Sequence, residues 1–374
     1  MLSSVFAKNT QKNTDGRITN VICNSAKQGL IPQREYFDKN IANSDNTNGY
    51  YIIEENDFVY NPRKSADAPY GPISSYKYTE AGIVSPLYLC FRAKKEINPA
   101  FFEWYFRSSA WHRYVYMSGD SGARHDRVSI KDDTFFAMSI NIPSAHEQAQ
   151  IAIFLERIEQ RIEMQRALVD SLKKYKRGVV AAIFSHQLKF SDATGNPYPE
   201  WTSCTLQDAV DFLDGQRKPL ESADRAKRQG QYPYYGASGI IDYIDDFIFD
   251  EPLLLLGEDG ANILNRSTPL CFIAEGKYWV NNHAHVMRPK AGQNIKFLCE
   301  LLESLDYTRY NTGTAQPKLN QDKCRRIGLA LPVYEEQCHI ADFLSAFDQR
   351  TDKAQSILDY LLSNRDGLLQ QLFI

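Results

Sequence analysis

One segment of the chain occurs twice, and this duplication constrains the fold more than any other feature. The first copy runs from Pro143 to Ser185 and the second from Pro332 to Ile374, and no gap is needed to align them. Equivalent residues therefore lie about 189 positions apart. A chain built on such a repeat is expected to be pseudo-symmetric, and its ligand is expected to have two parts as well.

Both copies carry apolar residues spaced alternately by four and three, which is the seam of a coiled coil. The seam runs from Ile151 to Ile183 in the first copy and from Ile340 to Leu372 in the second. Each copy predicts a helix of roughly 36 residues, or roughly 54 Å. The two helices are expected to pair with each other, and a closed pseudo-two-fold arrangement requires them to run antiparallel.

Two details of these helices can be tested in a structure. Lys176 and Arg365 occupy the same seam position, where a basic residue costs stability but can fix the register. Because both lie near helix ends, we expect their charged groups to extend into solvent. Ser144, followed three residues later by Glu147, predicts a capping box at the start of the first helix.

The regions outside the repeat are mixtures of short strands, turns and single helices. Strands are predicted near Tyr50–Ile53, Phe58–Tyr60 and Leu87–Phe91, and helices over Ala100–Ser118 and Lys296–Leu305. The two regions end in loosely similar sequences. The first has Ser121-Gly122 followed by Arg127–Ser129, and the second has Thr312-Gly313 followed by Lys318–Asn320. The predicted domains are a globule over 1–142, a helix over 143–186, a connector over 187–201, a second globule over 202–331 and a second helix over 332–374.

Composition limits the functional classes that remain. The net charge of −3 argues against a surface wholly covered by nucleic acid but allows local basic patches. Seven scattered cysteines without a CxxC pattern are typical of a reduced, cytoplasmic protein. The N-terminus lacks the apolar core of a signal peptide, and the longest apolar run, Pro252–Leu256, is too short to span a bilayer. We therefore expect a soluble protein without a membrane partner.

Two like globules held by paired helices would present two binding surfaces at a fixed separation, which suits a periodic polymer such as double-stranded DNA. Basic, amide and glycine-rich loops supply the groups that contact phosphates and base edges, although each loop taken singly also fits an ordinary solvated loop. In the first globule the predicted DNA-binding residues are Tyr60, Asn61, Arg63, Lys64, Arg124, His125 and Arg127. In the second they are Arg217, Lys218, Tyr235, Ser238, Asn281, Asn282, His283, Thr314, Gln316 and Lys318.

An enzyme is the main alternative. His283 and His285 would point to one face of a strand, with Glu258 and Asp259 nearby in sequence, so a metal-dependent hydrolase is conceivable. The sequence has no HExxH, no phosphate-binding GxxxxGK[ST] loop and no GxSxG elbow. We expect a non-catalytic chain without a cofactor or metal. A third alternative is a coiled-coil adaptor that makes no DNA contact.

Several long motifs in the same order resemble the DNA-specificity subunit of type I restriction–modification systems over nearly the whole chain. The helix opening P-x3-E-Q-x2-I-A-x-F-L occurs at Pro143 and at Pro332. The connector Phe190–Trp201 is similar to the linker of that family. The segments similar to its target-recognition domains are Gly29–Gln33 through Tyr60–Pro62, Tyr232–Ile240, Leu256–Ala261, Trp279–Val286 and Thr312–Asn320.

The resemblance implies an α+β protein with two target-recognition domains of mixed helices and strands, separated by two long antiparallel coiled-coil helices. Each domain would read one half of a bipartite double-stranded DNA site, and the two halves would differ. The helices would set the spacing and dock two methylation subunits, which carry S-adenosylmethionine, while a restriction–translocase subunit would add cleavage.

One departure from the family pattern concerns the first globule. Trp201 precedes the second globule, which is entered through Leu206 and Val210. The first globule has only Leu2 and Phe6 at comparable places and no preceding tryptophan. We therefore expect the last helix to close the first domain unaided.

Overall fold

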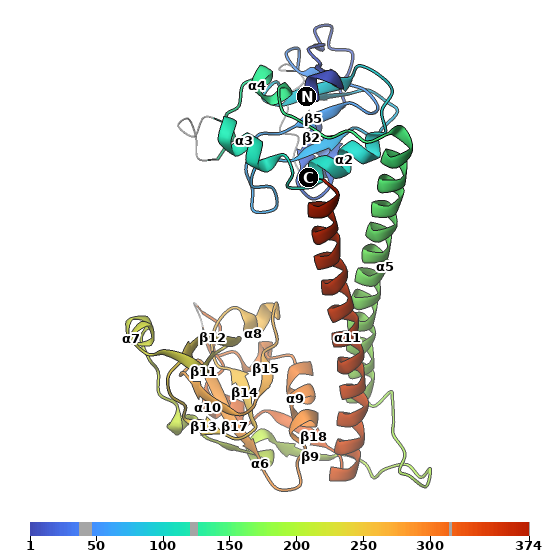
Figure 1. Cartoon of the computed structure of the whole chain (residues 1–374). Helices are drawn as coiled ribbons and strands as arrows, with labels where there is room; N and C mark the ends of the chain where they lie inside the picture. Colours follow the sequence, from blue (N-terminus) through green and yellow to red (C-terminus); the bar gives the residue numbers. More distant parts are fainter. Residues whose placement is uncertain (37–46, 120–125, 314–315, 374) are drawn as a thin grey trace. The chain divides into compact units, whose positions relative to one another are not determined.

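The computed structural model describes residues 1–36, 47–119, 126–313 and 316–373, and the chain forms two compact units. Unit 1 comprises Met1–Arg166 and Ser356–Ile374, and unit 2 comprises Ala167–Gln355. The two long helices are α5 (Ala145–Phe184) and α11 (Tyr334–Leu372) (Figure 1). Both boundaries between the units fall inside these helices, so each unit contains part of α5 and part of α11.

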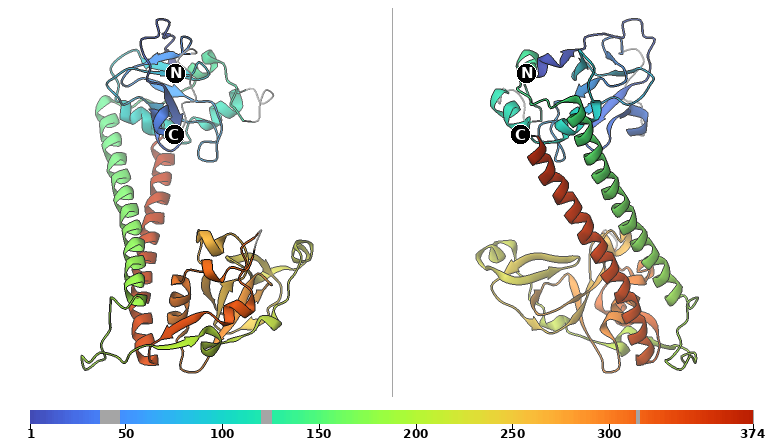
Figure 2. Two further views of the ribbon diagram at one scale, coloured as in Figure 1. Left: turned by 180° about the vertical axis from the view of Figure 1, so that it is seen from behind. Right: turned by 45° about the vertical axis from the view of Figure 1, so that its right-hand side comes forward.

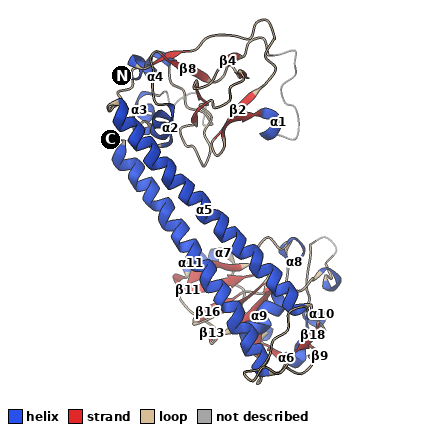
Figure 3. Ribbon diagram, turned by 90° about the vertical axis from the view of Figure 1, so that its right-hand side faces the viewer, coloured by secondary structure: helices blue, strands red, loops and turns tan. Residues whose placement is uncertain are grey.

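Unit 1 is built on a four-stranded antiparallel sheet in the order β1-β8-β5-β6, with short helices around it (Figure 3). The strands of this sheet are β1 (Phe6–Lys8), β8 (Leu89–Ala93), β5 (Phe58–Tyr60) and β6 (Ile73–Ser75). Two smaller strand pairs are β2 (Ile22–Ser25) with β3 (Gly29–Pro32) and β4 (Tyr51–Ile53) with β7 (Gly82–Val84). The helices are α1 (Gln33–Tyr36), α2 (Pro99–Arg107), α3 (His112–Ser118) and α4 (Asp132–Phe136), with a 3₁₀ turn at Leu2–Ser4. The predicted strands are confirmed.

The core of unit 1 is unusually aromatic. The ring of Phe6 meets those of Phe58, Phe91 and Phe102 edge to face at 5.0–5.3 Å between centroids. Such contacts add to the stabilisation that burial alone provides. The predicted helix over Ala100–Ser118 is wrong in one respect, because it is interrupted after Arg107. Ser108 adopts an extended conformation there, and its hydroxyl donates to the Tyr105 carbonyl at 2.6 Å.

Unit 2 contains two four-stranded sheets and one strand pair. The first sheet has the order β10-β17-β14-β15, from β10 (Val210–Phe212), β17 (Ala284–Pro289), β14 (Leu253–Gly257) and β15 (Cys271–Ala274). The second has the order β12-β11-β16-β13, from β12 (Gly239–Ile244), β11 (Gln229–Gly236), β16 (Lys277–Val280) and β13 (Phe249–Asp250). The pair is β18 (Gly328–Leu331) with β9 (Thr202–Thr205). The helices are α6 (Leu206–Ala209), α7 (Ser222–Lys227), α8 (Asn262–Asn265), α9 (Ile295–Ser304) and α10 (Gln321–Arg325), with 3₁₀ turns at Asp214–Gln216 and Thr308–Tyr310.

The first sheets of the two units follow one plan. In each, the first strand pairs with the last, and the two middle strands form the other half of the sheet. The helix that follows, α2 or α9, begins in each unit at an asparagine, Asn98 or Asn294, whose side chain accepts backbone N–H bonds of the first turn. The predicted helix over Lys296–Leu305 is confirmed as α9. The duplication therefore extends from the helices into the globules, although the sequences of the globules differ.

The long helices pair antiparallel within each unit. In unit 1 the buried Leu155 of α5 shares a core with Leu369 near the end of α11, and the two segments lie side by side in both views of Figure 2. In unit 2 the ring of Tyr175 meets Phe347 at 5.5 Å. The predicted capping box is present, since Ser144 and Glu147 exchange hydrogen bonds at 3.0 and 3.3 Å. No helix in the described part of the chain is long and apolar enough to cross a lipid bilayer.

The two basic seam residues do not extend into solvent, so that prediction is wrong. Lys176 lies 2.6 Å from Glu300 and 2.7 Å from Asp348, and its side chain is only 20% exposed. Arg365 lies 3.2 Å from Glu159 in unit 1. Asp348 and Glu159 are themselves repeat mates, so the units make one interhelical ion pair twice. Carboxylates on the facing helix supply partners inside the seam, and the pairs fix the antiparallel register.

Replacing Lys176 with methionine should destabilise unit 2, because Glu300 and Asp348 then lose their cationic partner in a half-buried place. The expected loss in free energy of unfolding is roughly 1–3 kcal/mol, between the values for exposed and for buried pairs. Denaturant unfolding measures this loss, and Lys174→Met on the exposed face of α5 is the matched control. Equal stability of the two variants would contradict a role for this ion pair.

The pH dependence of the same contribution has a definite sign. Burial alone would lower the pKa of Lys176, but the hydrogen bonds that it donates to Asp348 and Glu300 outweigh burial and raise this pKa above its ordinary value. The stabilisation is therefore complete below the ordinary lysine pKa and disappears as the pH rises through the raised one. The difference between wild type and Lys176→Met should be constant around neutral pH and shrink only in strongly alkaline solution.

Candidate nucleic-acid interface in each unit

In unit 1 a short backbone ladder forms where the central strand β5 ends. Arg63 pairs with Arg127 as an isolated antiparallel bridge. On either side of the bridge, the N–H groups of Val128 and Lys64 donate across the ladder at 2.9 Å each. The ladder holds three basic side chains at one end of the sheet.

Unit 2 has the same ladder at the end of β14, the strand equivalent to β5. Asp259 pairs with Lys318 as an isolated antiparallel bridge. The N–H groups of Leu319 and Gly260 donate across it at 2.7 and 3.0 Å. This geometry confirms the sequence parallel between Arg127–Ser129 and Lys318–Asn320, while Ser121 and Gly122 lie outside the described residues.

The side chains on the unit 1 ladder are suited to bind phosphate. Arg63 and Lys64 are exposed, and Arg127 is half-buried beside Asp126, with 3.8 Å between its Nε and the carboxylate. The buried Nε of Arg127 has no hydrogen-bond partner among the described residues. An unsatisfied guanidinium N–H is costly unless an acceptor arrives, and a phosphate oxygen is a strong acceptor.

A groove of about 760 Å³ adjoins this ladder and contains residues that were not predicted from the sequence. Lys27 and Gln28 are exposed at the turn between β2 and β3, and Leu87, which also lines the groove, is 59% exposed. Lysine and glutamine can contact phosphates and adenine edges, and an exposed leucine can contact a thymine methyl group. The turn Ala26–Gly29 is visible in the sequence, but its position beside Arg63 is set by strand pairing.

In unit 2 several distant segments converge on the ladder. The hairpin tip between β11 and β12 approaches β14 so closely that a Cβ at Gly257 would lie 2.7 Å from the Ala237 carbonyl oxygen. Only glycine allows this contact, and it places the exposed Ser238 next to the ladder. His283 joins from the other side, with its Nδ1 2.8 Å from a carboxylate oxygen of Asp259.

A buried network of charged side chains lies beneath the exposed residues of the unit 2 ladder and holds them in position. The Arg217 guanidinium lies 2.8 Å from Glu258 and 3.6 Å from Asp214, and its side chain is 14% exposed. His285 is fully buried and lies 2.7 Å from Asp214. Burial alone would raise the pKa of Asp214, but the hydrogen bonds from His285 and the Val286 N–H, together with the charge of Arg217, hold it below its ordinary value. Arg217 therefore positions Glu258 rather than facing DNA.

The metal-site alternative does not fit this geometry. His283 and His285 pair with different carboxylates, Asp259 and Asp214. The Nε2 of His285 lies 2.7 Å from the Leu319 carbonyl oxygen, so both of its ring nitrogens already have hydrogen-bond partners within the protein. In the described ranges no group of three or more His, Cys, Asp or Glu side chains is arranged to hold a metal ion.

Several of the predicted DNA-binding residues prove to be structural. Tyr60 is 1% exposed, and its hydroxyl donates to the Tyr70 carbonyl at 2.8 Å. Asn281 is 5% exposed and accepts the His283 N–H. The ring of Tyr235 packs on Phe272 and Tyr278. Arg124, His125 and Thr314 lie outside the described residues.

The remaining predicted residues lie at the surface. Asn61 braces the unit 1 ladder by accepting the Arg63 N–H at 3.1 Å. In unit 2, Lys218 is exposed, and its carbonyl accepts the Trp279 indole N–H at 2.6 Å. The exposed candidates near the ladders are Arg63, Lys64, Ser238, Asn282, His283, Gln316 and Lys318.

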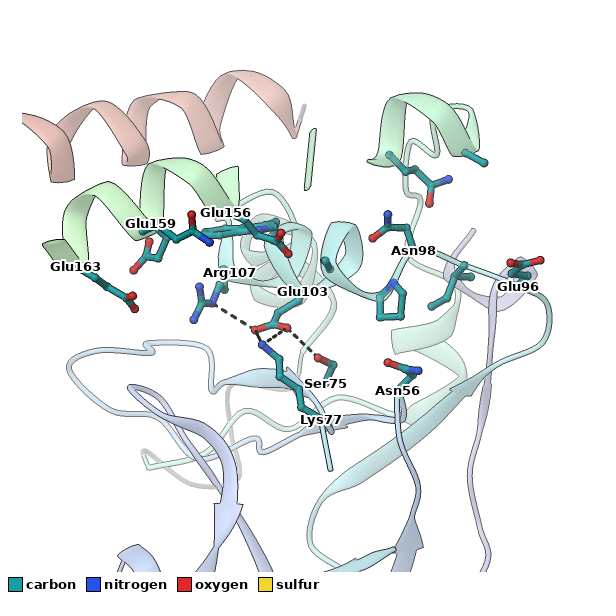
Figure 4. A pocket seen from close by; sticks show the side chains of 17 residues that line it. Asn56, Ser75, Lys77, Glu96, Asn98, Glu103, Arg107, Glu156, Glu159 and Glu163 are labelled. Atoms are coloured by element: carbon teal, nitrogen blue, oxygen red, sulfur yellow. Dashed lines mark hydrogen bonds and ion pairs between the residues drawn. The ribbon is translucent and has the colours of Figure 1, made fainter. Parts of the chain in front are cut away.

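Another face of unit 1 is unsuited to DNA. A groove of about 890 Å³ between α2 and α5 is lined by five glutamates, among them Glu156, Glu159 and Glu163 along α5 (Figure 4). Its two cations, Lys77 and Arg107, both lie within 4 Å of Glu103. This negative surface repels phosphates, which leaves the ladder side of unit 1 as the candidate interface.

Comparison with known proteins agrees with this division into two similar units. A putative type I restriction enzyme specificity subunit, S.HindORF215P of Haemophilus influenzae, is 32% identical over 155 residues, which is 41% of this chain and 38% of the relative. The EcoprrI type I restriction enzyme specificity subunit of Escherichia coli is 28% identical over 154 residues, 41% of this chain and 37% of the relative. The chain thus aligns with less than half the length of these relatives.

Solved structures share the fold over the whole chain. The type I restriction–modification S subunit of M. genitalium matches with a TM-score of 0.57 and 15% identity, covering 100% of this chain and 95% of that one. The HsdS subunit of Thermoanaerobacter tengcongensis matches with a TM-score of 0.52 and 15% identity, at the same coverage. A structure described as the basis of complex assembly and conformational transition in the type I system reaches 0.62, with 14% identity over 99% of this chain and 95% of that one.

A family model for the type I restriction modification DNA specificity domain matches residues 5–174 and again residues 198–361. The two matches follow the internal duplication and together cover most of the chain. The chain therefore belongs to the family of type I restriction–modification DNA specificity proteins.

Proposed function

We propose that this chain is the non-catalytic specificity subunit of a type I restriction–modification complex and that it recognises a bipartite double-stranded DNA site. Each unit reads one half of the site through its ladder and the loops beside it. The paired helices set the spacing between the halves. Methylation, and cleavage by a restriction–translocase subunit, are supplied by partners. We also infer that the chain acts in the cytoplasm, a location that agrees with its seven free cysteines.

The observation that carries this proposal is the ladder that occurs twice. The backbone geometry is the same in both units, but the side chains on it differ. Unit 1 presents Arg63, Lys64 and Arg127, whereas unit 2 presents Lys318 and His283 beside paired carboxylates. The same backbone geometry carrying different side chains favours two half-sites of different base sequence.

The outer faces of the long helices support docking of methylation subunits. Apolar and aromatic residues outside the seam are exposed there, including Met164 at 67% and Tyr360 at 65%. Leu168 and Ile357 are repeat mates and are 45% and 40% exposed. Exposed apolar side chains of this kind mark protein interfaces. The repetition of one such exposed apolar position on both helices, as Leu168 and Ile357, favours two equivalent partner subunits.

The first test concerns phosphate contacts in unit 1. Arg63→Ala and Lys64→Ala should weaken binding about equally for all DNA sequences, and each should reduce the salt slope of log K by about 1. Binding of the assembled complex to DNA over a range of salt concentrations measures this. Lys77→Ala, on the acidic side of unit 1, is the control and should leave both quantities unchanged. A loss that is confined to one base position would contradict phosphate binding.

The second test concerns the assignment of halves. Gln28→Ala in unit 1 and Gln316→Ala in unit 2 should each relax one base position, at a cost of about 1–3 kcal/mol for the cognate site. Binding to a library of single-base variants separates the two halves, and melting temperatures control for folding. If Gln28→Ala and Gln316→Ala alter base preference in the same half of the site, the assignment of one half to each unit is wrong.

The third test concerns spacing. One heptad inserted after Val169 and one after Ala354 keeps both seams in phase, because the ion-pair register places these two points opposite each other. Each helix lengthens by roughly 10 Å, or about three base pairs of DNA, which also rotates by roughly 100° over that distance. Modification of the native site should be lost.

Insertion into one helix alone should mismatch the pair and lower the melting temperature, which provides a contrast with the double insertion. A folded double-insertion variant that still modifies DNA at the native spacing would show that the helices do not set the distance.

A further inference from the structure

In unit 1 the turn between β7 and β8 holds one apolar side chain, that of Leu87, out into the groove beside the ladder. The Tyr88 N–H donates to the Ser85 carbonyl at 3.0 Å, and the Ser85 hydroxyl accepts the Leu87 N–H at 3.3 Å. Pro86 restricts the backbone at the second position of this turn. Tyr88 packs on the buried core to which β2 and β3 contribute. Leu87 is therefore 59% exposed on a turn whose backbone is fixed.

The strand registers show that Leu87 of unit 1 and His283 of unit 2 occupy the same position. In each unit, the residue three positions before Arg63 or Asp259 of the ladder pairs with a residue of the neighbouring strand. These pairs are Tyr60 with Leu89 in unit 1 and Leu256 with His285 in unit 2. Leu87 and His283 each lie two residues before the second member of the pair, so they are equivalent.

The local geometry of the two turns agrees with this equivalence. In unit 2 the side-chain oxygen of Asn281 accepts the His283 N–H at 2.8 Å, just as the Ser85 hydroxyl accepts the Leu87 N–H in unit 1. The His283 side chain is 50% exposed. Both units thus present one exposed residue on the same kind of turn beside the ladder, but the residue is apolar in unit 1 and polar in unit 2.

The surroundings of Leu87 indicate what its side chain contacts. The cations that line the groove are Lys27, Arg63, Lys64 and Arg127. Among its described lining residues the one carboxylate is that of Asp67, which lies 3.5 Å from Lys27. An exposed leucine amid these cations fits a ligand that has phosphates outside and an apolar group within. In the major groove of DNA, the C5 methyl group of thymine is such a group.

We propose that this position determines the base that each unit reads, and that Leu87 contacts the C5 methyl group of a thymine in the half-site of unit 1. The inference rests on the proposed function, because it requires the ladder side of unit 1 to bind DNA. His283, whose Nδ1 lies 2.8 Å from the Asp259 carboxylate, offers hydrogen bonding at the equivalent place, so unit 2 reads a base there without requiring a methyl group.

Replacing thymine with deoxyuridine removes the C5 methyl group and leaves the hydrogen-bonding groups of the base in place. Each thymine of the cognate site is replaced in turn, and binding of the assembled complex is measured. One replacement should weaken binding about fourfold, which is the effect of one methyl group removed from water. In the Leu87→Ala complex, the thymine and uracil forms of that site should bind equally well.

Met117→Ala is the matched control. Met117 is an apolar residue of unit 1 that is 73% exposed and does not line the groove. Its replacement should keep the fourfold difference between thymine and uracil. Melting temperatures equal to that of the wild type establish that both variants are folded.

A complex that selects its cognate site but loses no affinity at any uracil overturns the inference and leaves the proposed function intact. A thymine preference that persists in the Leu87→Ala complex also overturns it, because another residue then contacts the methyl group. Loss of the methylation subunits from the Leu87→Ala complex would place a protein on this turn and contradict a contact with DNA. A complex without any sequence preference would refute the proposed function and this inference together.

Discussion

The antiparallel pairing of α5 with α11 is the constraint on which both halves of this protein depend. Each unit takes residues from both helices into its core, as with Leu155 and Leu369 in unit 1 and Ile183 and Ile340 in unit 2. Neither globule therefore completes its core from its own strands alone. The interhelical ion pair, made once by Lys176 and once by Arg365, holds both ends in the same register. A slip of the helices would disturb both cores together.

The two units share the backbone geometry of the ladder, whereas the side chains on the ladder differ between them. The ladders at Arg63 and Asp259 use backbone hydrogen bonds, which do not depend on side-chain identity. The side chains on them are then available to differ, and they do so in charge. Unit 1 offers cations and an unsatisfied Arg127 nitrogen, whereas unit 2 offers Lys318 and His283, which are already paired with Glu258 and Asp259. This difference is what two unlike DNA half-sites require.

Local patterns in the sequence predicted the parts of the fold that depend on periodicity. The heptads, the capping box at Ser144 and helix α9 were all predictable in this way. Tertiary contacts decided the rest. The break at Ser108 follows from its own hydroxyl bonding backward, and the buried seam position of Lys176 follows from carboxylates that lie 124 and 172 residues away. Tyr60 and Asn281 were mistaken for surface residues because a loop sequence does not reveal which side chains fold beneath it. Lys27 and Leu87 were missed because strand pairing alone brings them to the ladder.

Genome-wide mapping of DNA methylation tests the central claim most directly. Cells that hold the cognate methylation subunit are compared with and without this chain. We predict that methylation at one motif depends on the chain, and that the motif has two unlike halves separated by a spacer of fixed length. An unchanged methylation pattern, or a chain-dependent motif that is continuous rather than split, would contradict recognition of a bipartite site by two units.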